Sequence, residues 1–143
     1  MKKVTIVASK KHCQGKSFLI KNMLLAFQNP VGVFLKEEEI MNPFIFSEVT
    51  KQTDVIAFHN CSVDHFKKLC PILLDDKMVI EKRGHERYTL SMPKVIIEMI
   101  DPIYSFQRII DTSLLRRISL IEASITKIAG VHKDKVFIND RLF

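Results

Sequence analysis

Short apolar runs separated by amphipathic segments make up most of the chain. Continuous runs of four to eight apolar and β-branched residues are typical of strands that are buried on both faces of a sheet. We expect such strands at Val4–Ala8, Val31–Leu35, Asp54–Phe58, Lys94–Ile100 and Ile118–Ala123.

Apolar residues at helical spacing lie between several of these runs. Phe18–Gln28 has this spacing, and Asn29-Pro30 would end the helix. Val63–Leu69 is a shorter amphipathic helix closed by Pro71, and Ser113–Arg117 is a third predicted helix. Strands that alternate with helices predict an α/β domain with a mostly parallel sheet of about five strands.

A β-hairpin is predicted before the strand that begins at Lys94. Met78–Arg83 and Arg87–Ser91 flank a turn that contains Gly84, which is a typical hairpin pattern. The tail after Ala123 is mixed, with one short strand expected at Lys135–Ile138. The length of 143 residues favours a single domain over 1–143, with its core at 4–123 and a tail at 124–143.

Charge and cysteine content narrow the class of protein only a little. The formal net charge of +6 is compatible with a polyanionic partner but does not require one. The three cysteines form no C-x-x-C pair, and an odd number argues against a disulfide framework. The first apolar run is too short for a secretory signal, and no run is long enough to span a membrane. We therefore expect a cytoplasmic protein without a membrane segment.

The segment from Lys10 to Ser17 has the pattern of a phosphate-binding loop. It follows the first strand, carries Gly15-Lys16-Ser17, and opens into the first helix. In such a loop, backbone N–H groups surround the phosphates, the lysine reaches the outer phosphates and the serine hydroxyl holds Mg²⁺. Gly15, Lys16 and Ser17 are the expected phosphate ligands, together with Gln14. Lys10 replaces the first glycine of the pattern and would place its ammonium group near the phosphates.

This order of elements resembles the P-loop NTPase core. More narrowly, it resembles the superfamily-3 helicase branch of the AAA+ ATPases, which is found in viral and plasmid replication proteins. After the Gly15–Ser17 segment, Thr53–Asn60 stands where that family has a strand ending in two acids. Met78–Pro93 resembles its hairpin, and Ser113–Glu122 resembles its Ser-x-x-Arg-Arg segment and closing strand. The resemblance covers residues 4–123, and it implies a central first strand and a site for ATP and Mg²⁺.

One departure from the pattern of that family indicates weak or absent ATP hydrolysis. His59 and Asn60 replace the two acids that orient Mg²⁺ and activate water in that family. Imidazole is a poor Mg²⁺ ligand, and an asparagine can orient a water but cannot accept its proton. Glu98 and Asp101, at the end of a neighbouring strand, are the local candidates for a catalytic base.

Two further groups of basic residues stand at positions that have functional roles in the resembled family. Arg116 and Arg117 would act as a finger toward a neighbouring subunit's nucleotide, which requires an oligomer. The alternative is a pair of solvated arginines. The hairpin would contact single-stranded DNA through its basic side chains, although an exposed hairpin is also charged for solubility. These hairpin residues are Lys82, Arg83, His85 and Arg87.

A zinc site is not expected. His12, Cys13, His59 and Cys61 could converge if the first and third strands end side by side, and two histidines with two cysteines suit tetrahedral zinc. Their spacing, however, is not that of a zinc motif.

Three functions therefore stay open. The first is a degenerate ATP-binding module that hydrolyses little and binds nucleic acid or a replication partner. The second is a structural or protein-interaction domain that binds no nucleotide, and the third is an active ATPase.

Overall fold

A computed structural model describes residues 4–11, 14–36, 45–108, 114, 116–127 and 134–139. Three helices are labelled within this part of the chain: α1 (Lys16–Leu24), α2 (Val63–Leu73) and α3 (Ile103–Gln107). The strands are β1 (Val4–Ser9), β2 (Pro30–Phe34), β3 (Val55–Cys61), β4 (Lys77–Ile80), β5 (Tyr88–Ser91), β6 (Lys94–Pro102), β7 (Ile118–Lys127) and β8 (Asp134–Asn139). None of the described helices is long and apolar enough to cross a membrane.

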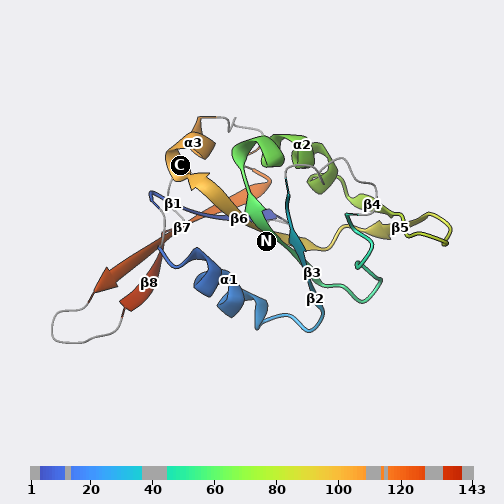
Figure 1. Cartoon of the computed structure of the whole chain (residues 1–143), viewed down its shortest axis with the longest axis horizontal. Helices are drawn as coiled ribbons and strands as arrows, with labels where there is room; N and C mark the ends of the chain where they lie inside the picture. Colours follow the sequence, from blue (N-terminus) through green and yellow to red (C-terminus); the bar gives the residue numbers. More distant parts are fainter. Residues whose placement is uncertain are drawn as a thin grey trace.

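The central element is a six-stranded sheet in the order β2-β3-β6-β1-β7-β8 (Figure 1). Its first five strands pair in parallel, and β8 joins β7 as an antiparallel edge strand. The expected α/β architecture with a mostly parallel sheet is confirmed, and the short strand expected in the tail extends this same sheet. β1 lies inside the sheet, with parallel neighbours on both sides.

Helices cover both faces of this sheet, with α1 on one face and α2 and α3 on the other (Figure 1). Alternate residues of β1 pack on the two faces of the sheet, since successive side chains of a strand point to opposite faces. Val7 packs in a cluster with Leu19 and Ile20 of α1. Ile6 belongs to the larger cluster on the other face, which also contains Phe66 of α2 and Phe106 of α3.

The connections after β1 and β6 leave the sheet toward opposite faces. The chain passes from β1 to α1 on one side and from β6 directly to α3 on the other. In open α/β sheets, the crevice at the carboxyl ends of two such strands is the usual position of a ligand. The loop after β1 and the last residues of β6 meet at this position.

The end of β3 contains a β-bulge. Phe58 pairs with Ile97 but Cys61 pairs with Met99, so β3 uses one residue more than β6 over this interval. Asn60 has a φ of 65° and is the single non-glycine residue with positive φ among the described residues. Asparagine tolerates this left-handed conformation better than most residues.

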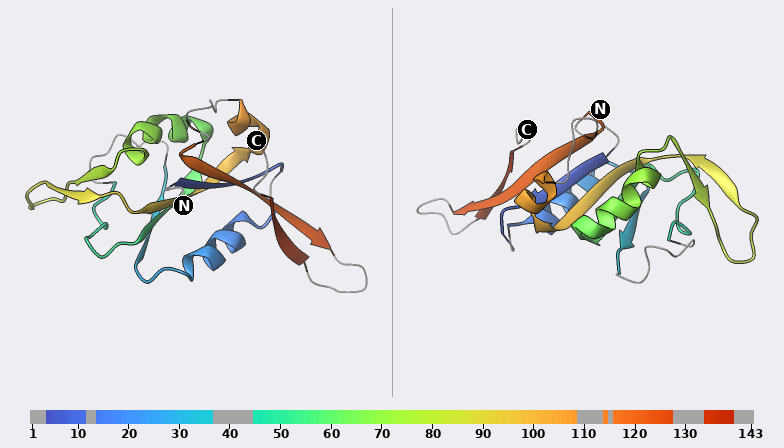
Figure 2. Two further views of the ribbon diagram at one scale, coloured as in Figure 1. Left: turned by 180° about the vertical axis from the view of Figure 1, so that it is seen from behind. Right: turned by 90° about the horizontal axis from the view of Figure 1, so that it is seen from above.

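The predicted hairpin is confirmed, with shorter strands than expected. β4 and β5 pair from Lys77–Ser91 to Ile80–Tyr88, and residues 81–87 form the connecting loop. Gly84 supplies the positive φ of 75° in this loop. The hairpin projects from the body of the molecule beside the amino end of β6 (Figures 1 and 2).

Some helix predictions were wrong in their boundaries. α1 ends at Leu24, before Gln28 and the Asn29-Pro30 pair. α2 is not closed by Pro71 but continues through it to Leu73. A proline here leaves the carbonyl of Lys67 without its helical partner, and water can bind that carbonyl because Lys67 is exposed.

Candidate functional site

The loop after β1 ends at Gly15, which precedes α1. Gly15 has φ 79° and ψ 22°, the left-handed conformation that glycine adopts without steric cost. Its carbonyl accepts a 2.9 Å hydrogen bond from the backbone N–H of Leu19, so Lys16 and Ser17 are the first two helical residues. The first turn contains no acidic residue, and no side chain caps the helix. This helix end therefore presents backbone N–H groups and the positive end of the helix dipole.

Lys16 reaches from α1 to the end of β6. Its ammonium group donates a 2.7 Å hydrogen bond to the backbone carbonyl of Met99, and the residue is half-buried. This contact holds a positive charge at the carboxyl end of β6, beside the loop that follows β1.

Ser17 reaches the neighbouring residue of the same strand. Its hydroxyl donates a 2.7 Å hydrogen bond to Oε2 of Glu98, and Ser17 is exposed. An ionised carboxylate can only accept, so the hydroxyl proton points at Glu98 and the oxygen keeps its lone pairs for another partner. The two helical residues of the motif thus contact two consecutive residues of β6.

Lys10 adopts no left-handed conformation, so its replacement of glycine carries no backbone strain there. Its ammonium group lies 3.8 Å from Oε1 of Glu122 on β7, and its side chain is 77% exposed. Ion pairs with such exposed lysines contribute little to stability. Gln14 is half-buried in the bend before Gly15, while the neighbouring His12 and Cys13 lie outside the described residues.

The structure separates the two candidate catalytic carboxylates. Glu98 and Asp101 are three residues apart on β6, so they face opposite sides of the sheet. Oδ2 of Asp101 accepts a 2.7 Å hydrogen bond from the backbone N–H of Val63, at the start of α2. Asp101 therefore stabilises α2, on the face of the sheet opposite the contact between Ser17 and Glu98.

Asn60 and His59 also have local partners at the end of β3. The side-chain amide of Asn60 donates a 3.0 Å hydrogen bond to the carbonyl of Leu35. The ring of His59 lies against β2, where a Cβ added to Gly32 would be 3.7 Å from Nε2. Asn60 thus joins the ends of β2 and β3.

Arg116 and Arg117 lie far from the loop of their own chain. They occupy an exposed turn just before β7, and Ile118 pairs with Val4 at the amino end of β1. Gly15 follows the other end of β1. The structure therefore does not bring these arginines to the site within one chain, and their role toward a neighbouring subunit stays a prediction. Ser113, where the predicted third helix begins, lies outside the described residues.

The basic hairpin residues are also distant from the loop, because the hairpin lies at the amino end of β6. Arg87 pairs with Glu81 at 2.7 Å, and the Lys82 ammonium lies 5.9 Å from the centroid of the Tyr88 ring. Arg83 and His85 are exposed.

The described residues contain no group of three or more His, Cys, Asp and Glu side chains that could hold a metal ion. Of the four residues considered for zinc, His12 and Cys13 lie outside the described part. Cys61 is buried in the cluster on the α2 face, whereas His59 lies against Gly32 of β2. Burial, with a smaller contribution from the charge of Asp101, raises the pKa of the Cys61 thiol from 9.0 to about 12. Such a thiol is a poor metal ligand at neutral pH, because the ligand is the thiolate.

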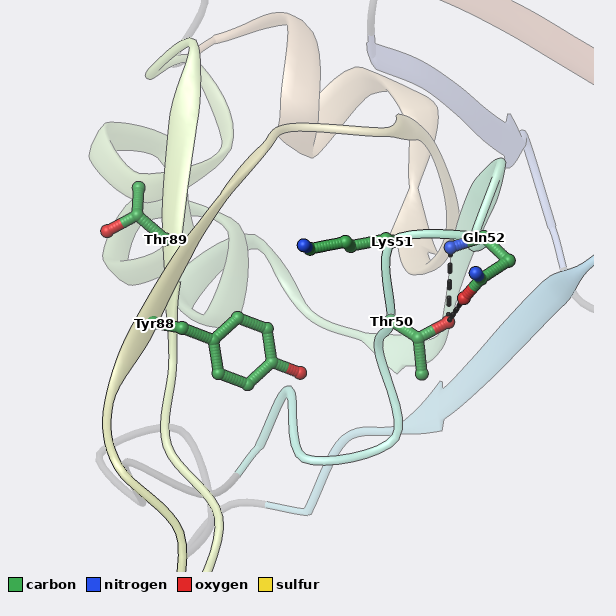
Figure 3. A pocket seen from close by; sticks show the side chains of 5 residues that line it. All are labelled: Thr50, Lys51, Gln52, Tyr88 and Thr89. Atoms are coloured by element: carbon green, nitrogen blue, oxygen red, sulfur yellow. Dashed lines mark hydrogen bonds between the residues drawn. The ribbon is translucent and has the colours of Figure 1, made fainter.

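Sequence reasoning missed two open pockets, because each is formed by segments that are distant in the chain. One pocket, of about 470 Å³, lies between the loop before β3 and strand β5 (Figure 3). In it the Tyr88 ring points toward the Thr50 segment, and its hydroxyl donates a 3.2 Å hydrogen bond to the carbonyl of Val49. The other, of about 550 Å³, lies at the start of α2 and is lined by Asn60, Ser62, Asp64, His65, Lys67, Lys68 and Ile100.

Neither the models of known protein families nor the curated proteins match this sequence. The functional assignment therefore depends on the chemistry of the loop after β1 and of the residues that it contacts.

Proposed function

We propose that this chain is a nucleotide-binding module that holds the phosphates of ATP, with Mg²⁺, at the carboxyl ends of β1 and β6. The observation that carries the proposal is the position of Gly15, Lys16 and Ser17. They place a helix N-terminus, an ammonium group and a hydroxyl together at the crevice where open α/β sheets bind ligands.

The strand arrangement supports a P-loop NTPase-like core related to superfamily-3 helicases. The loop follows a strand that has parallel neighbours on both sides, and a hairpin is inserted between α2 and β6. Both features agree with the expectations from the resemblance.

The residues near the loop fit a magnesium ion that is bound together with phosphate. Mg²⁺ prefers hard oxygen ligands and usually binds through one or two protein oxygens, substrate phosphates and water. The Ser17 hydroxyl is such an oxygen, and Glu98, which accepts its hydrogen bond at 2.7 Å, supports it from behind with a negative charge. The ion would neutralise phosphate charge beside Ser17.

The module would hydrolyse ATP little, because the end of β3 offers no acid. Asn60 contacts Leu35 and Asp101 contacts Val63, so neither is directed at the loop. Phosphoryl transfer depends on positioning and charge stabilisation, so the replacement of the family's two acids by His59 and Asn60 should lower the rate of hydrolysis.

Thermal unfolding with ATP and Mg²⁺ tests the proposal. We expect a rise in Tm of the parent protein at millimolar nucleotide, because a ligand that binds only the folded state stabilises it. Lys16→Ala should lose this rise. Lys21→Ala, an exposed lysine of the same helix, should keep it. If millimolar ATP with Mg²⁺ leaves the parent Tm unchanged, the chain is better described as an interaction domain.

We also propose that the loop of the hairpin binds single-stranded DNA. Arg83 and His85 are exposed in residues 81–87, which project from the body of the molecule (Figure 2). Phosphate contacts require only positive charge at accessible positions. Fluorescence anisotropy with a labelled oligonucleotide should show binding that weakens as salt increases, and binding should weaken further in Arg83→Ala. Lys67→Ala removes one exposed charge from α2 and serves as the control. Binding that does not respond to salt would argue against this role.

A further inference from the structure

The hydroxyl of the loop serine is bonded to a carboxylate from β6. Ser17 donates to Oε2 of Glu98 at 2.7 Å across 81 positions in the sequence. At the end of β3 stand His59 and Asn60, neither of which is a carboxylate. The acidic partner of the loop is therefore on the strand adjacent to β1 in the sheet.

Three other carboxylates at or near the ends of strands bind partners away from Ser17. Asp101 binds the first backbone N–H of α2, on the other face of the sheet. Glu122 lies on β7 at 3.8 Å from Lys10. Asp54 accepts hydrogen bonds from the backbone N–H groups of Gln28 and Asn29, before β3 begins. Each of these three carboxylates has a partner other than the Ser17 hydroxyl.

This geometry has an electrostatic consequence for an anionic ligand. A phosphate at the start of α1 would be close to the negative charge of Glu98, which opposes its binding. A divalent cation between the two anions reverses this effect. The bond to Glu98 also fixes the Ser17 hydroxyl with its proton directed toward β6, so its lone pairs are oriented for a cation.

We propose that Glu98 is the positioning residue that makes nucleotide binding at this loop dependent on magnesium. It orients the Ser17 hydroxyl toward the ion and repels phosphate when the ion is absent. The proposal rests on the proposed function, since it concerns the same site.

The test measures ATP affinity by calorimetry, once with excess Mg²⁺ and once with EDTA. For the parent protein we expect Mg²⁺ to tighten binding by about tenfold or more, in the range by which outer-shell partners change metal affinity. Glu98→Gln keeps an oxygen that can accept from Ser17 but removes the charge. This variant should bind metal-free ATP more tightly than the parent does, and most of its Mg²⁺ enhancement should be lost.

A second readout is the binding of Mn²⁺ to the protein with ATP, measured by electron paramagnetic resonance. We expect weaker Mn²⁺ binding in Glu98→Gln and also in Ser17→Ala, which removes the oriented hydroxyl. Glu48→Gln makes the same change of charge at an exposed turn residue and should behave as the parent. Thermal unfolding without nucleotide establishes that each variant is folded.

The outcomes separate the two proposals. If the parent fails to bind ATP even with Mg²⁺, the proposed function falls and this inference falls with it. If the parent binds ATP but Glu98→Gln retains the full Mg²⁺ enhancement, nucleotide binding stands and the role of Glu98 is overturned. Equal affinity of the parent with Mg²⁺ and with EDTA also overturns it.

Discussion

The backbone N–H of Val63 donates a 2.7 Å hydrogen bond to Oδ2 of Asp101, which joins the start of α2 to the end of β6. A carboxylate at this position stabilises the helix through its unpaired N–H groups and its dipole. The charge of Asp101 also opposes ionisation of the nearby Cys61 thiol. The Asp101 carboxylate therefore acts on both the start of α2 and the Cys61 thiol.

The Cys61 thiol should be almost unreactive in the folded protein. Burial is the main cause of its raised pKa of about 12, and the charge of Asp101 is the smaller cause. At pH 8 the thiolate is then about 1,000-fold rarer than for a thiol with a pKa of 9. A variant with Cys61 as its single cysteine should react with a disulfide reagent slowly when folded and rapidly in denaturant. Asp101→Asn should leave most of this protection in place, since burial remains. Fast labelling of the folded protein would contradict this prediction.

The same shift predicts a loss of stability at alkaline pH. The folded pKa lies above the unfolded value, so between pH 9 and pH 12 the unfolded chain loses a proton that the folded chain keeps. The free energy of unfolding should fall by about 1.4 kcal/mol per pH unit from this group in that window, and not below it. Other groups also titrate there, so the measurement is the difference between the parent and Cys61→Ala in urea denaturation. A pH-independent difference would show that the shift is absent.

Gly15→Ala should destabilise the fold and weaken nucleotide binding. A side chain at φ 79° costs about 1–2 kcal/mol, and relaxation of the strain would move the start of α1. Gly84→Ala is the matched control, because Gly84 has φ 75° and a Cβ there would have no atom within 4 Å. Urea denaturation should show similar losses for both, while only Gly15→Ala should reduce stabilisation by ATP and Mg²⁺. An equal reduction in both variants would argue against a local role for Gly15.

Ser62→Ala should destabilise α2 by about 1 kcal/mol. The Ser62 side chain accepts from the backbone N–H of His65 at 3.0 Å, and Nδ1 of His65 accepts from the backbone N–H of Ser62 at 3.1 Å. This reciprocal pair is a capping box with histidine in place of the usual glutamate or glutamine. Ser62→Thr keeps the hydroxyl and should retain most of the stability. Equal denaturation midpoints for the alanine variant and the parent would show that the cap contributes nothing.

Phe106→Ala should cost about 3–5 kcal/mol, because it removes a large buried ring. The rings of Phe66 and Phe106 meet edge to face, with centroids 5.0 Å apart, and both are buried between the helices and the sheet. Tyr104→Ala, in the same short helix, changes a side chain that is 54% exposed and should cost far less. Calorimetric or urea unfolding of both variants gives the comparison. Similar costs would mean that α3 is not held by Phe106.

The sequence was sufficient to predict the elements with strong local patterns. β1, β2, β3 and β6 are short apolar runs, and Gly84 marked the turn of the hairpin. The start of α1 could be predicted because Gly15-Lys16-Ser17 ends a short loop that follows an apolar strand. Glu98 and Asp101 could also have been separated in advance, because residues three apart on a strand face opposite sides.

Other features had no local signal. α3 has five residues after Pro102, too few to show helical periodicity. The bulge at Asn60 depends on how β3 pairs with β6. The bond between Ser17 and Glu98 joins residues from distant parts of the chain, which only the strand order brings together. Long-range pairing therefore decided which carboxylate meets the loop.

β6 links the two regions for which we propose ligands. Its nine residues begin beside the hairpin, where the backbone N–H of Met92 donates to the carbonyl of Asp76, and they run past Glu98 and Met99 to Pro102. β6 is hydrogen-bonded to β1 on one side and to β3 on the other, so it cannot slide along its axis without breaking both ladders. The crevice at Glu98 and the base of the projecting hairpin are therefore held at a constant separation by a single strand.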